Sequence, residues 1–435
     1  MSDSSLPPHG VQVVVVDAGP DLPALDVRRP DGTRWSGVWL VVRVAGAPVA
    51  LVEVDLAGRD VLPADELRRA VDPVARAAAP RPVAVLPDDV LPSISVVVPT
   101  DARRPDQLRE CLAALAALQG PGLEVLVVDN SQGAEREGVV AAAAAGLPGV
   151  RVVREPVPGI SAARNAGVAA ARGEVVAFTD DDVQVDPDWL RALATRFARQ
   201  PDVELVTGLI LPGDLETDAQ LWFERHYGGF GGTRQFAPLT YRGRRSASPL
   251  RRSTVAIEDA TGARSGAMAV YGAGRCGAGA NFAVRTATLR RLGGFDPALG
   301  AGTPARGGED LALFIAHLWA GGAIGYEPTA VVFHAHRADE AGLRAQLHGY
   351  GLGYTAMLTA LVARDPRHLL GLAAQVAVQG AGRLHGRPAG TPDPTPSTVL
   401  GPPPPADLGA VEQRAKLLGP AAWVRSRRAA GRAAV

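Results

Sequence analysis

The sequence predicts an α/β protein built on a doubly wound, mostly parallel sheet that is flanked by helices. The first observation is that short, uniformly apolar runs alternate with helical patterns from residue 93 onward. The second is that a polar residue lies just past the end of each of four such runs: Thr100, Asp129, Arg154 and Asp180. In sheets of this kind ligands bind beyond the carboxyl ends of the strands, so these residues are expected to line one site.

The first 90 residues are predicted to form a small β-rich domain with its own linker. Runs rich in β-branched residues at 11–16, 37–44 and 49–54 alternate with turn residues, which indicates a small antiparallel sheet. A helical pattern follows at 65–78, and a proline-rich stretch then marks the linker. Because none of the chemical motifs falls in this part, we expect it to be dispensable for the chemical step.

Residues 91–340 are predicted to form the main domain, in which strands and helices alternate. The strands are expected at 94–98, 124–128, 150–153 and 175–178, and the helices at 105–119 and 161–172. A further helix carries Leu190, Leu193 and Phe197 on one apolar stripe. Residues 203–275 are glycine-rich and irregular, and the stretches 228–232 and 242–252 within them are interpreted as mobile connections over a cleft.

Two segments follow the main domain. Residues 341–383 are predicted to be a helical extension, and residues 384–435 a proline-rich linker with a basic tail. The tail, at 406–435, is interpreted as a frayed terminus, with a weak contact to a membrane surface as the alternative.

Composition and charge argue against several classes of protein. Lys+Arg and Asp+Glu number 45 each, so no net charge favours binding to nucleic acid. Cys111 and Cys276 belong to no metal-binding spacing, which argues against structural zinc and against a disulfide framework. There is no signal-peptide pattern and no run of about 18 apolar residues, so we expect a cytoplasmic protein, at most peripheral to the inner face of the membrane.

Three consecutive carboxylates follow the strand predicted at 175–178. In an extended chain alternate side chains share a face, so Asp180 and Asp182 point the same way and Asp181 the opposite way. Such a pair is half of a divalent-cation site, because Mg²⁺ takes one or two protein carboxylates together with water and substrate phosphates. The pattern indicates a metal-bound diphosphate and hence a nucleotide-activated substrate, with an acidic turn as the alternative.

Other residues with the chemistry of a nucleotide site occur along the main domain. Asp129 can accept a hydrogen bond from a nucleobase N–H, and Arg154 and Arg164 can neutralise a diphosphate. Glu309 and Asp310 follow a glycine pair at the start of a helix, where the helix dipole alone also favours acids.

A pair of histidines lies near the end of the main domain. His334 and His336 share one face of an extended segment that ends in Arg337. A neutral imidazole at this position can be a metal ligand, and Arg337 can meet phosphate, whereas a structural histidine is the alternative interpretation.

Taken in order, these segments resemble the successive motifs of family 2 glycosyltransferases. The motifs are SVVVPT at 95–100, VVDN at 127–130, GISAARNAG at 159–167, FTDDD at 178–182, GANFAVR at 279–285, GGFD at 293–296, GED at 308–310 and HAHR at 334–337. Each motif is weak by itself, but the ordered set is specific, and the resemblance covers about residues 93–340.

The resemblance implies a GT-A fold and an inverting, metal-assisted transfer from a nucleotide-diphosphate sugar to an acceptor hydroxyl, in a role such as cell envelope polysaccharide biosynthesis. By the same resemblance, Asp310 is the catalytic base and Glu309 an acceptor contact. Mg²⁺ or Mn²⁺ would be bound by Asp180 and Asp182, with His334 beside it. The donor would be bound by Thr100, Asp129, Arg154, Arg164, Asp180, Asn281 and Arg337.

Several alternatives remain at this stage. The segment at 100–103, Thr-Asp-Ala-Arg, departs from the family's commoner Thr-Tyr-Asn-Arg, and the acceptor is undefined: a saccharide, a lipid-linked molecule or a small molecule. A nucleotidyltransferase of sugar phosphates would carry a glycine-rich loop after the first strand, which 101–104 lacks. A non-catalytic nucleotide-sugar-binding protein would not need Asp310. The Gly-x-Gly-x-x-Gly match at 272–277 opens no strand–helix unit, which argues against a dinucleotide-binding dehydrogenase.

Overall fold

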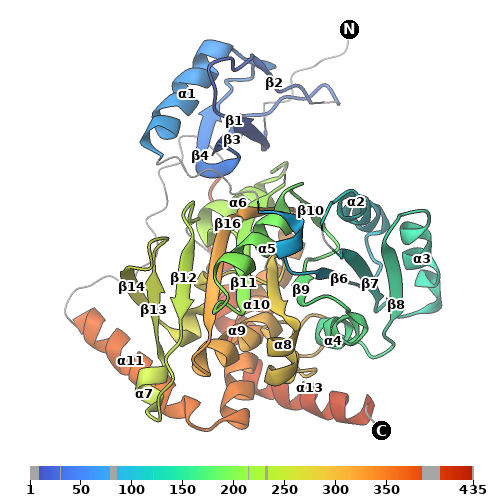
Figure 1. Cartoon of the computed structure of the whole chain (residues 1–435), viewed down its shortest axis with the longest axis vertical. Helices are drawn as coiled ribbons and strands as arrows, with labels where there is room; N and C mark the ends of the chain where they lie inside the picture. Colours follow the sequence, from blue (N-terminus) through green and yellow to red (C-terminus); the bar gives the residue numbers. More distant parts are fainter. Residues whose placement is uncertain are drawn as a thin grey trace.

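The computed structural model describes residues 9–29, 31–78, 86–120, 122–213, 215–230, 234–384 and 402–433, without the side chains of 378–384, 432 and 433. The chain forms a small N-terminal unit on top of a large α/β body, with the last helices below (Figure 1). Among the described residues, no helix combines the length and the hydropathy that a membrane span requires.

The body is organised around one mixed sheet. Over the described residues its strands are β6 (Ile94–Thr100), β7 (Glu124–Asp129), β8 (Val150–Arg154), β9 (Val175–Phe178), β10 (Val183–Val185), β11 (Leu205–Pro212), β12 (Leu239–Arg242), β13 (Thr254–Glu258), β14 (Arg264–Ala269), β15 (Phe282–Arg285) and β16 (Ala323–His334). Their order is β14-β13-β12-β16-β11-β15-β9-β6-β7-β8, and β10 pairs with β16.

The predicted α/β architecture is confirmed. Strands β9, β6, β7 and β8 pair in parallel, and β11 and β16 run in the same direction on the far side of the antiparallel strand β15. The sheet is covered on both faces: Val97 of β6 joins one apolar core, and Val96 and Val98 join the other. Because successive side chains of β6 point into two different apolar cores, the sequence of this strand is continuously apolar.

Helices pack on both faces of the sheet, and several of them contribute apolar stripes to these two cores. The helices of the body are α2 (Pro105–Ala116), α3 (Val139–Ala144), α4 (Ile160–Ala170), α5 (Trp189–Arg199), α6 (Asp218–Tyr227), α7 (Pro249–Arg252), α8 (Thr286–Leu292), α9 (Glu309–Trp319), α10 (Glu340–Arg364) and α11 (His368–Leu384). Leu190, Leu193 and Phe197 of α5 are all buried in one core, as their spacing predicted.

The interpretation of residues 203–275 as irregular connections was wrong. This segment supplies β11, an inner strand of the sheet, and the antiparallel strands β12, β13 and β14 that extend the sheet beyond β16. The strands after β11 are only four to six residues long, which is too short for a clear period of two to stand out in the sequence.

The N-terminal unit contains β1 (Val11–Asp17), β3 (Gly37–Val44) and β4 (Ala47–Asp55), the short pair β2 (Leu25–Asp26) and β5 (Val61–Leu62), and α1 (Ala64–Ala77). Strands β3 and β4 are antiparallel as predicted, but β1 pairs in parallel with β3. Two parallel strands must start at the same end of the sheet, so the chain has to cross back between them. The connection at 18–36 is long enough to do so.

This unit packs directly on the body. Val41 of β3 is fully buried in a cluster with Leu209, Leu211 and Val331, which belong to β11 and β16. Arg43 also pairs with Asp186, just after β10. The unit therefore covers apolar surface of the sheet near the ends of β11 and β16.

The end of the chain is not a frayed terminus over the described residues. Helices α12 (Leu408–Lys416) and α13 (Gly419–Ala433) pack against α10, and Ala415 and Ala422 are buried with Leu352 in that contact. The hydroxyl of Thr355 donates to the carbonyl of Lys416 at 2.8 Å. The basic residues of α13 had suggested an unsupported helix, because the apolar positions that dock it are mostly alanine.

Candidate active site

The carboxylates after β9 lie at the carboxyl edge of the sheet, as predicted. Asp181 accepts a hydrogen bond from the hydroxyl of Thr100 at 2.6 Å, across the neighbouring strand β6. Asp180 and Asp182 face the other way, toward the end of β16. One ligand atom each of Asp180, Asp182 and His334 lies within 4.8 Å of the others.

His334 reaches this cluster because β10 pairs antiparallel with β16. In this register Val183 lies opposite His334, so the preceding Asp182 comes close to the imidazole. Its Nε2 lies 3.4 Å from Oδ1 of Asp182, and its side chain is buried. Burial lowers the pKa of His334 against the opposing effect of Asp182, so the imidazole is neutral near pH 7. Its Nδ1 has no hydrogen-bond partner among the described residues.

Two carboxylates and a neutral imidazole suit Mg²⁺ or Mn²⁺ and leave coordination positions for water and phosphate. The arrangement therefore fits the cation that the sequence predicted.

Arg104 and Arg337 border the same carboxylates. Nη1 of Arg104 lies 2.6 Å from Oδ2 of Asp182, and its Nη2 lies 3.4 Å from Oδ1 of Asp181. Nη1 of Arg337 is 3.9 Å from Asp182 and its side chain is largely exposed. Burial raises the pKa of Asp182, but His334, Arg104 and Arg337 outweigh burial and hold it below the usual value. Sequence reasoning missed Arg104, although it follows β6 at the edge where ligands were expected.

Arg164 is placed differently from its prediction. Its side chain is 1% exposed, and its guanidinium donates to Oε1 of Glu309 at 2.7 Å, to Oδ1 of Asp180 at 3.3 Å and to the carbonyl of Gly279 at 3.1 Å. Burial raises the pKa of Glu309 to about 7, and the neighbouring Asp310 adds to this increase. Arg164 thus joins the two acidic motifs from inside the protein.

Asp310 lies in the first turn of α9 and is less buried than Glu309. Its Oδ2 accepts the N–H of Gly279 at 2.7 Å and its Oδ1 accepts the N–H of Leu311 at 2.7 Å. A Cβ at position 279 would lie 2.9 Å from Nη2 of Arg164 and 3.0 Å from Oδ2 of Asp310. Glycine at 279 therefore lets the backbone pass between the two side chains.

Asp129 and Arg154 are register partners on β7 and β8, and Thr100 is the partner of Asp129 on β6. Nη1 of Arg154 donates to Oδ1 of Asp129 at 3.3 Å and to its carbonyl at 2.8 Å. A polar cavity of about 320 Å³ adjoins this pair, lined by Asp129, Ser131, Gly133, Ala134, Glu137, Gly138 and Arg154.

Two residues that were predicted to bind the sugar donor form hydrogen bonds inside the protein. Thr100 is 4% exposed and its hydroxyl also accepts the N–H of Ala102. Asn281 is fully buried: it accepts from the indole of Trp189 and donates to the carbonyls of Leu209 and Ala330. Both side chains hold strands together at the site's border.

The second histidine belongs to a separate buried network. Nε2 of His336 lies 2.6 Å from Oε1 of Glu224 in α6, and Arg234 pairs with the same carboxylate. Phe230 packs on His334 with ring centroids 4.5 Å apart. Sequence reasoning missed this support because Glu224, Phe230 and Arg234 lie in the segment that was interpreted as irregular.

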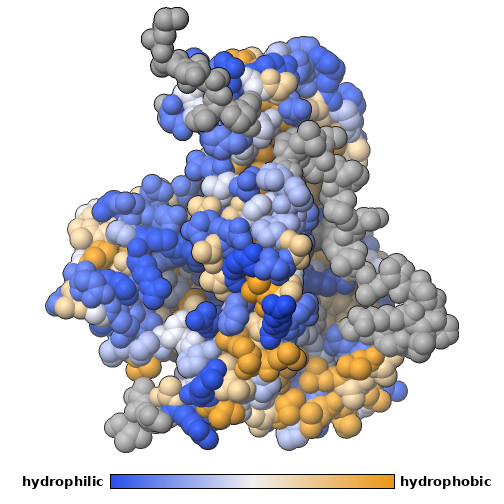
Figure 2. Space-filling view, turned by 180° about the vertical axis from the view of Figure 1, so that it is seen from behind, coloured by the Kyte–Doolittle hydropathy of each residue, from blue (hydrophilic) through white to orange (hydrophobic). Residues whose placement is uncertain are grey.

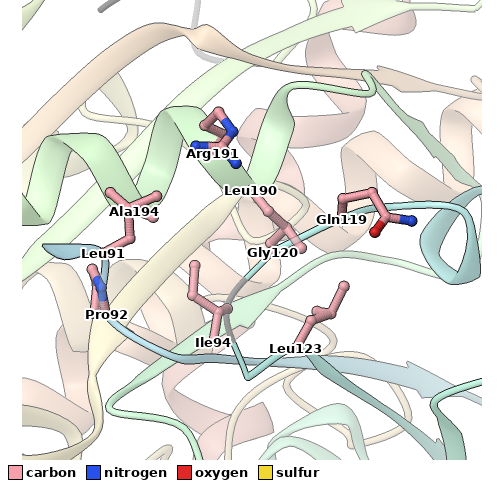
Figure 3. Close-up of a pocket in the computed structure, with 9 residues that line it drawn as sticks. All are labelled: Leu91, Pro92, Ile94, Gln119, Gly120, Leu123, Leu190, Arg191 and Ala194. Atoms are coloured by element: carbon pink, nitrogen blue, oxygen red, sulfur yellow. The ribbon is translucent and has the colours of Figure 1, made fainter. Parts of the chain in front are cut away.

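An apolar pocket elsewhere in the domain carries none of these residues. Figure 3 shows it between Leu91, Ile94, Leu123 and Leu190. It lies at the amino ends of β6 and β7, whereas the acidic cluster lies at the carboxyl ends.

Parts of the chain are similar to known proteins. Residues 95–256 match the model of glycosyl transferase family 2. The pre-mycofactocin glycosyltransferase of Mycobacterium tuberculosis is 29% identical over 261 residues, which is 59% of this chain and 46% of that protein. The glucosyl-dolichyl phosphate glucuronosyltransferase of Haloferax volcanii is 33% identical over 69 residues, 16% of this chain and 22% of that protein.

A mannosyltransferase structure from Pyrobaculum calidifontis aligns with 20% identity and a TM-score of 0.40, covering 80% of this chain and 89% of that one. The chain spans about half the length of the mycobacterial relative. The family match covers β6 to β13, which include the strands that carry Thr100, Asp129 and the acidic cluster after β9. Residues 95–256 are therefore similar to glycosyl transferase family 2.

Proposed function

We propose that this protein transfers a sugar from a nucleotide-diphosphate sugar to an acceptor hydroxyl, with inversion and with the help of a divalent cation. The observation that carries the proposal is the grouping of Asp180, Asp182 and His334 within 4.8 Å. Arg164 connects this group to the first turn of α9, where Asp310 follows Glu309. The mycobacterial relative, named as a glycosyltransferase, supports sugar transfer as the reaction class.

The donor would lie along the carboxyl edge of the sheet. The cavity beside Asp129 and Arg154 offers a carboxylate and a guanidinium to a nucleoside. The diphosphate would extend toward Asp182, where Arg104 and Arg337 supply positive charge. A cation held by the two aspartates and His334 would offset the charge that develops on the leaving diphosphate.

Asp310 is assigned the role of base. It is the more accessible of the two acids in α9, whereas the carboxylate of Glu309 is held by the buried Arg164. A carboxylate in the first turn of a helix packed in the core is held rigidly, so it can take the proton of an acceptor hydroxyl as that oxygen attacks the anomeric carbon. The predicted contact of Glu309 with the acceptor is replaced here by a positioning role, shared with Arg164.

The test is a panel of nucleotide-diphosphate sugars incubated with the purified full chain and Mn²⁺ or Mg²⁺. Release of nucleoside diphosphate is measured, and NMR of the transferred sugar reports the anomeric configuration. Asp182→Asn should lower the rate about 100-fold or more, because one carboxylate that holds the cation loses its charge. Asp101→Asn, at an exposed aspartate paired with Arg103, is the matched control.

Wild-type turnover by Asp182→Asn, with the same dependence on the metal, would refute the metal assignment. Release of pyrophosphate from a nucleoside triphosphate and a sugar phosphate would show a nucleotidyltransferase instead. Donor binding without turnover, across all acceptors tested, would favour a binding protein.

A further inference from the structure

Helix α11 presents an apolar face outward. Leu369 is 57% exposed, Leu370 58% and Val376 70%. Ala373 and Ala377 are exposed as well, so the exposed positions follow one another at the spacing of a single helical stripe. No Asp, Glu, Lys or Arg occurs from residue 368 to residue 382. A surface helix of a soluble protein usually carries charged residues on this side.

The inner side of α11 is firmly packed, so the outward face is set by the fold. His368 stacks on Trp319 with ring centroids 4.0 Å apart, and its Nδ1 lies 3.0 Å from the hydroxyl of Tyr271. Asp365, just before the helix, accepts the indole N–H of Trp319 at 3.0 Å. These contacts with α9 and the 270–275 turn fix the start of α11 with the apolar stripe facing outward.

Positive charge lies on one side of this face, on α7 and in the segment before it. Helix α7 packs against α11 and adds Leu250, which is 56% exposed. Arg244, Arg245 and Arg251 are exposed around it, and the segment 243–257 contains no acidic residue. The guanidinium of Arg252 lies 5.9 Å from the ring of Trp319, next to the start of α11.

Viewed from behind, apolar residues gather toward the lower right of the molecule, on the side where α11 lies (Figure 2). We propose that the apolar face of α11, together with α7 and its arginines, docks the protein on an anionic lipid surface. Leucine and valine side chains enter the boundary between head groups and acyl chains, and the arginines meet lipid phosphates.

The charge on this surface argues against a second copy of the chain as the partner. A twofold contact through α11 would bring Arg244, Arg245 and Arg251 of one copy close to the same residues of the other. Like charges brought together in an interface oppose association. An anionic bilayer, by contrast, is complementary both to the apolar face of α11 and to the arginines beside it.

The test is co-sedimentation of the full chain with vesicles of phosphatidylcholine alone and with 30 mol% phosphatidylglycerol (about one lipid in three anionic). Wild type should bind the anionic vesicles more tightly, and binding should fall as salt is raised, because screening weakens attraction to the surface. The triple variant Leu369→Gln, Leu370→Gln and Val376→Gln should bind about tenfold or more weakly. Arg244→Gln with Arg245→Gln and Arg251→Gln should lose about 100-fold.

The control is Val90→Gln, which changes a valine that is 54% exposed at a distant surface and should leave binding unchanged. Wild-type melting temperatures and donor hydrolysis by the variants would confirm that the fold is intact. Equal binding of wild type and both variants, or no binding of wild type to either vesicle, would overturn the proposal. A dimer in sedimentation equilibrium that the triple variant dissolves would identify a self-association face instead and also refute it.

Discussion

Replacing Arg164 by methionine tests the inner architecture of the site. The guanidinium is 1% exposed and neutralises Glu309, whose side chain is 9% exposed, while also bonding to Asp180. Removing one partner of a buried ion pair leaves the other charge uncompensated, which typically costs about 3–5 kcal/mol. With an unfolding entropy near 2.1 cal/mol/K per residue, this corresponds to a fall in Tm of about 3–5 °C for a chain of this length that unfolds cooperatively.

The pH dependence of this loss has a definite sign. The pKa of Glu309 is raised above its ordinary value, to about 7, by burial and by Asp310. Protonated Glu309 therefore favours the folded state, and this contribution is lost as the pH rises through 7. Without Arg164 the pKa of Glu309 should rise further, so the deficit of the variant should grow between pH 5.5 and pH 8.

The assay is thermal unfolding of wild type, Arg164→Met, Glu309→Gln and the double variant, at both pH values. The double variant should lose less stability than the two single variants lose in sum, because no unpaired carboxylate is left at position 309. Arg69→Met, which breaks an exposed pair with Asp65, should change stability far less than Arg164→Met. Strict additivity, or a loss for Arg164→Met no larger than this control's, would refute the reasoning.

Three further predictions follow from the same geometry. Asp310→Asn should lose transfer by about 10²–10⁴-fold while still binding nucleoside diphosphate; an active Asp310→Asn beside a folded, inactive Glu309→Gln would reverse the two roles. Arg104→Gln should bind Mn²⁺ about tenfold more tightly by calorimetry without nucleotide, since a cation 2.6 Å from Asp182 is removed; unchanged or weaker binding would contradict this. A chain lacking residues 1–90 should melt at a lower temperature and aggregate, because apolar side chains of β11 and β16 become exposed; a soluble protein with the wild-type Tm would argue against this.

That last prediction revises what the sequence alone suggested. The absence of motifs from the N-terminal part indicated that it is dispensable for the chemical step, which remains a prediction. The buried contact of Val41 with Leu209 and Val331 adds a role in stability that no local pattern reveals. Docking between distant segments depends on shape and exposed apolar area, and both arise only after each segment has folded.

The partners of His334 and His336 are a second feature that no local sequence pattern reveals. His336 was grouped with His334 because both lie on one face of an extended segment. In the structure, Nε2 of His336 lies 2.6 Å from Oε1 of Glu224, whereas His334 lies beside Asp182. Alternation correctly predicts which side chains share a face, but it does not predict which partner a neighbouring helix brings to that face.

The sequence by itself determined the parallel strands β6, β7, β8 and β9, the helices α2, α4 and α5 that pack on the sheet, and the common face of Asp180 and Asp182. These features depend on periods of two and of 3.6 residues and on the polar residue at each strand end, which are local properties of the chain. Only the tertiary structure decided that Arg104 borders Asp182 and that Arg164 is buried between Asp180 and Glu309. Such pairings depend on strand order and on the close approach of helices, which residues distant in the sequence determine jointly.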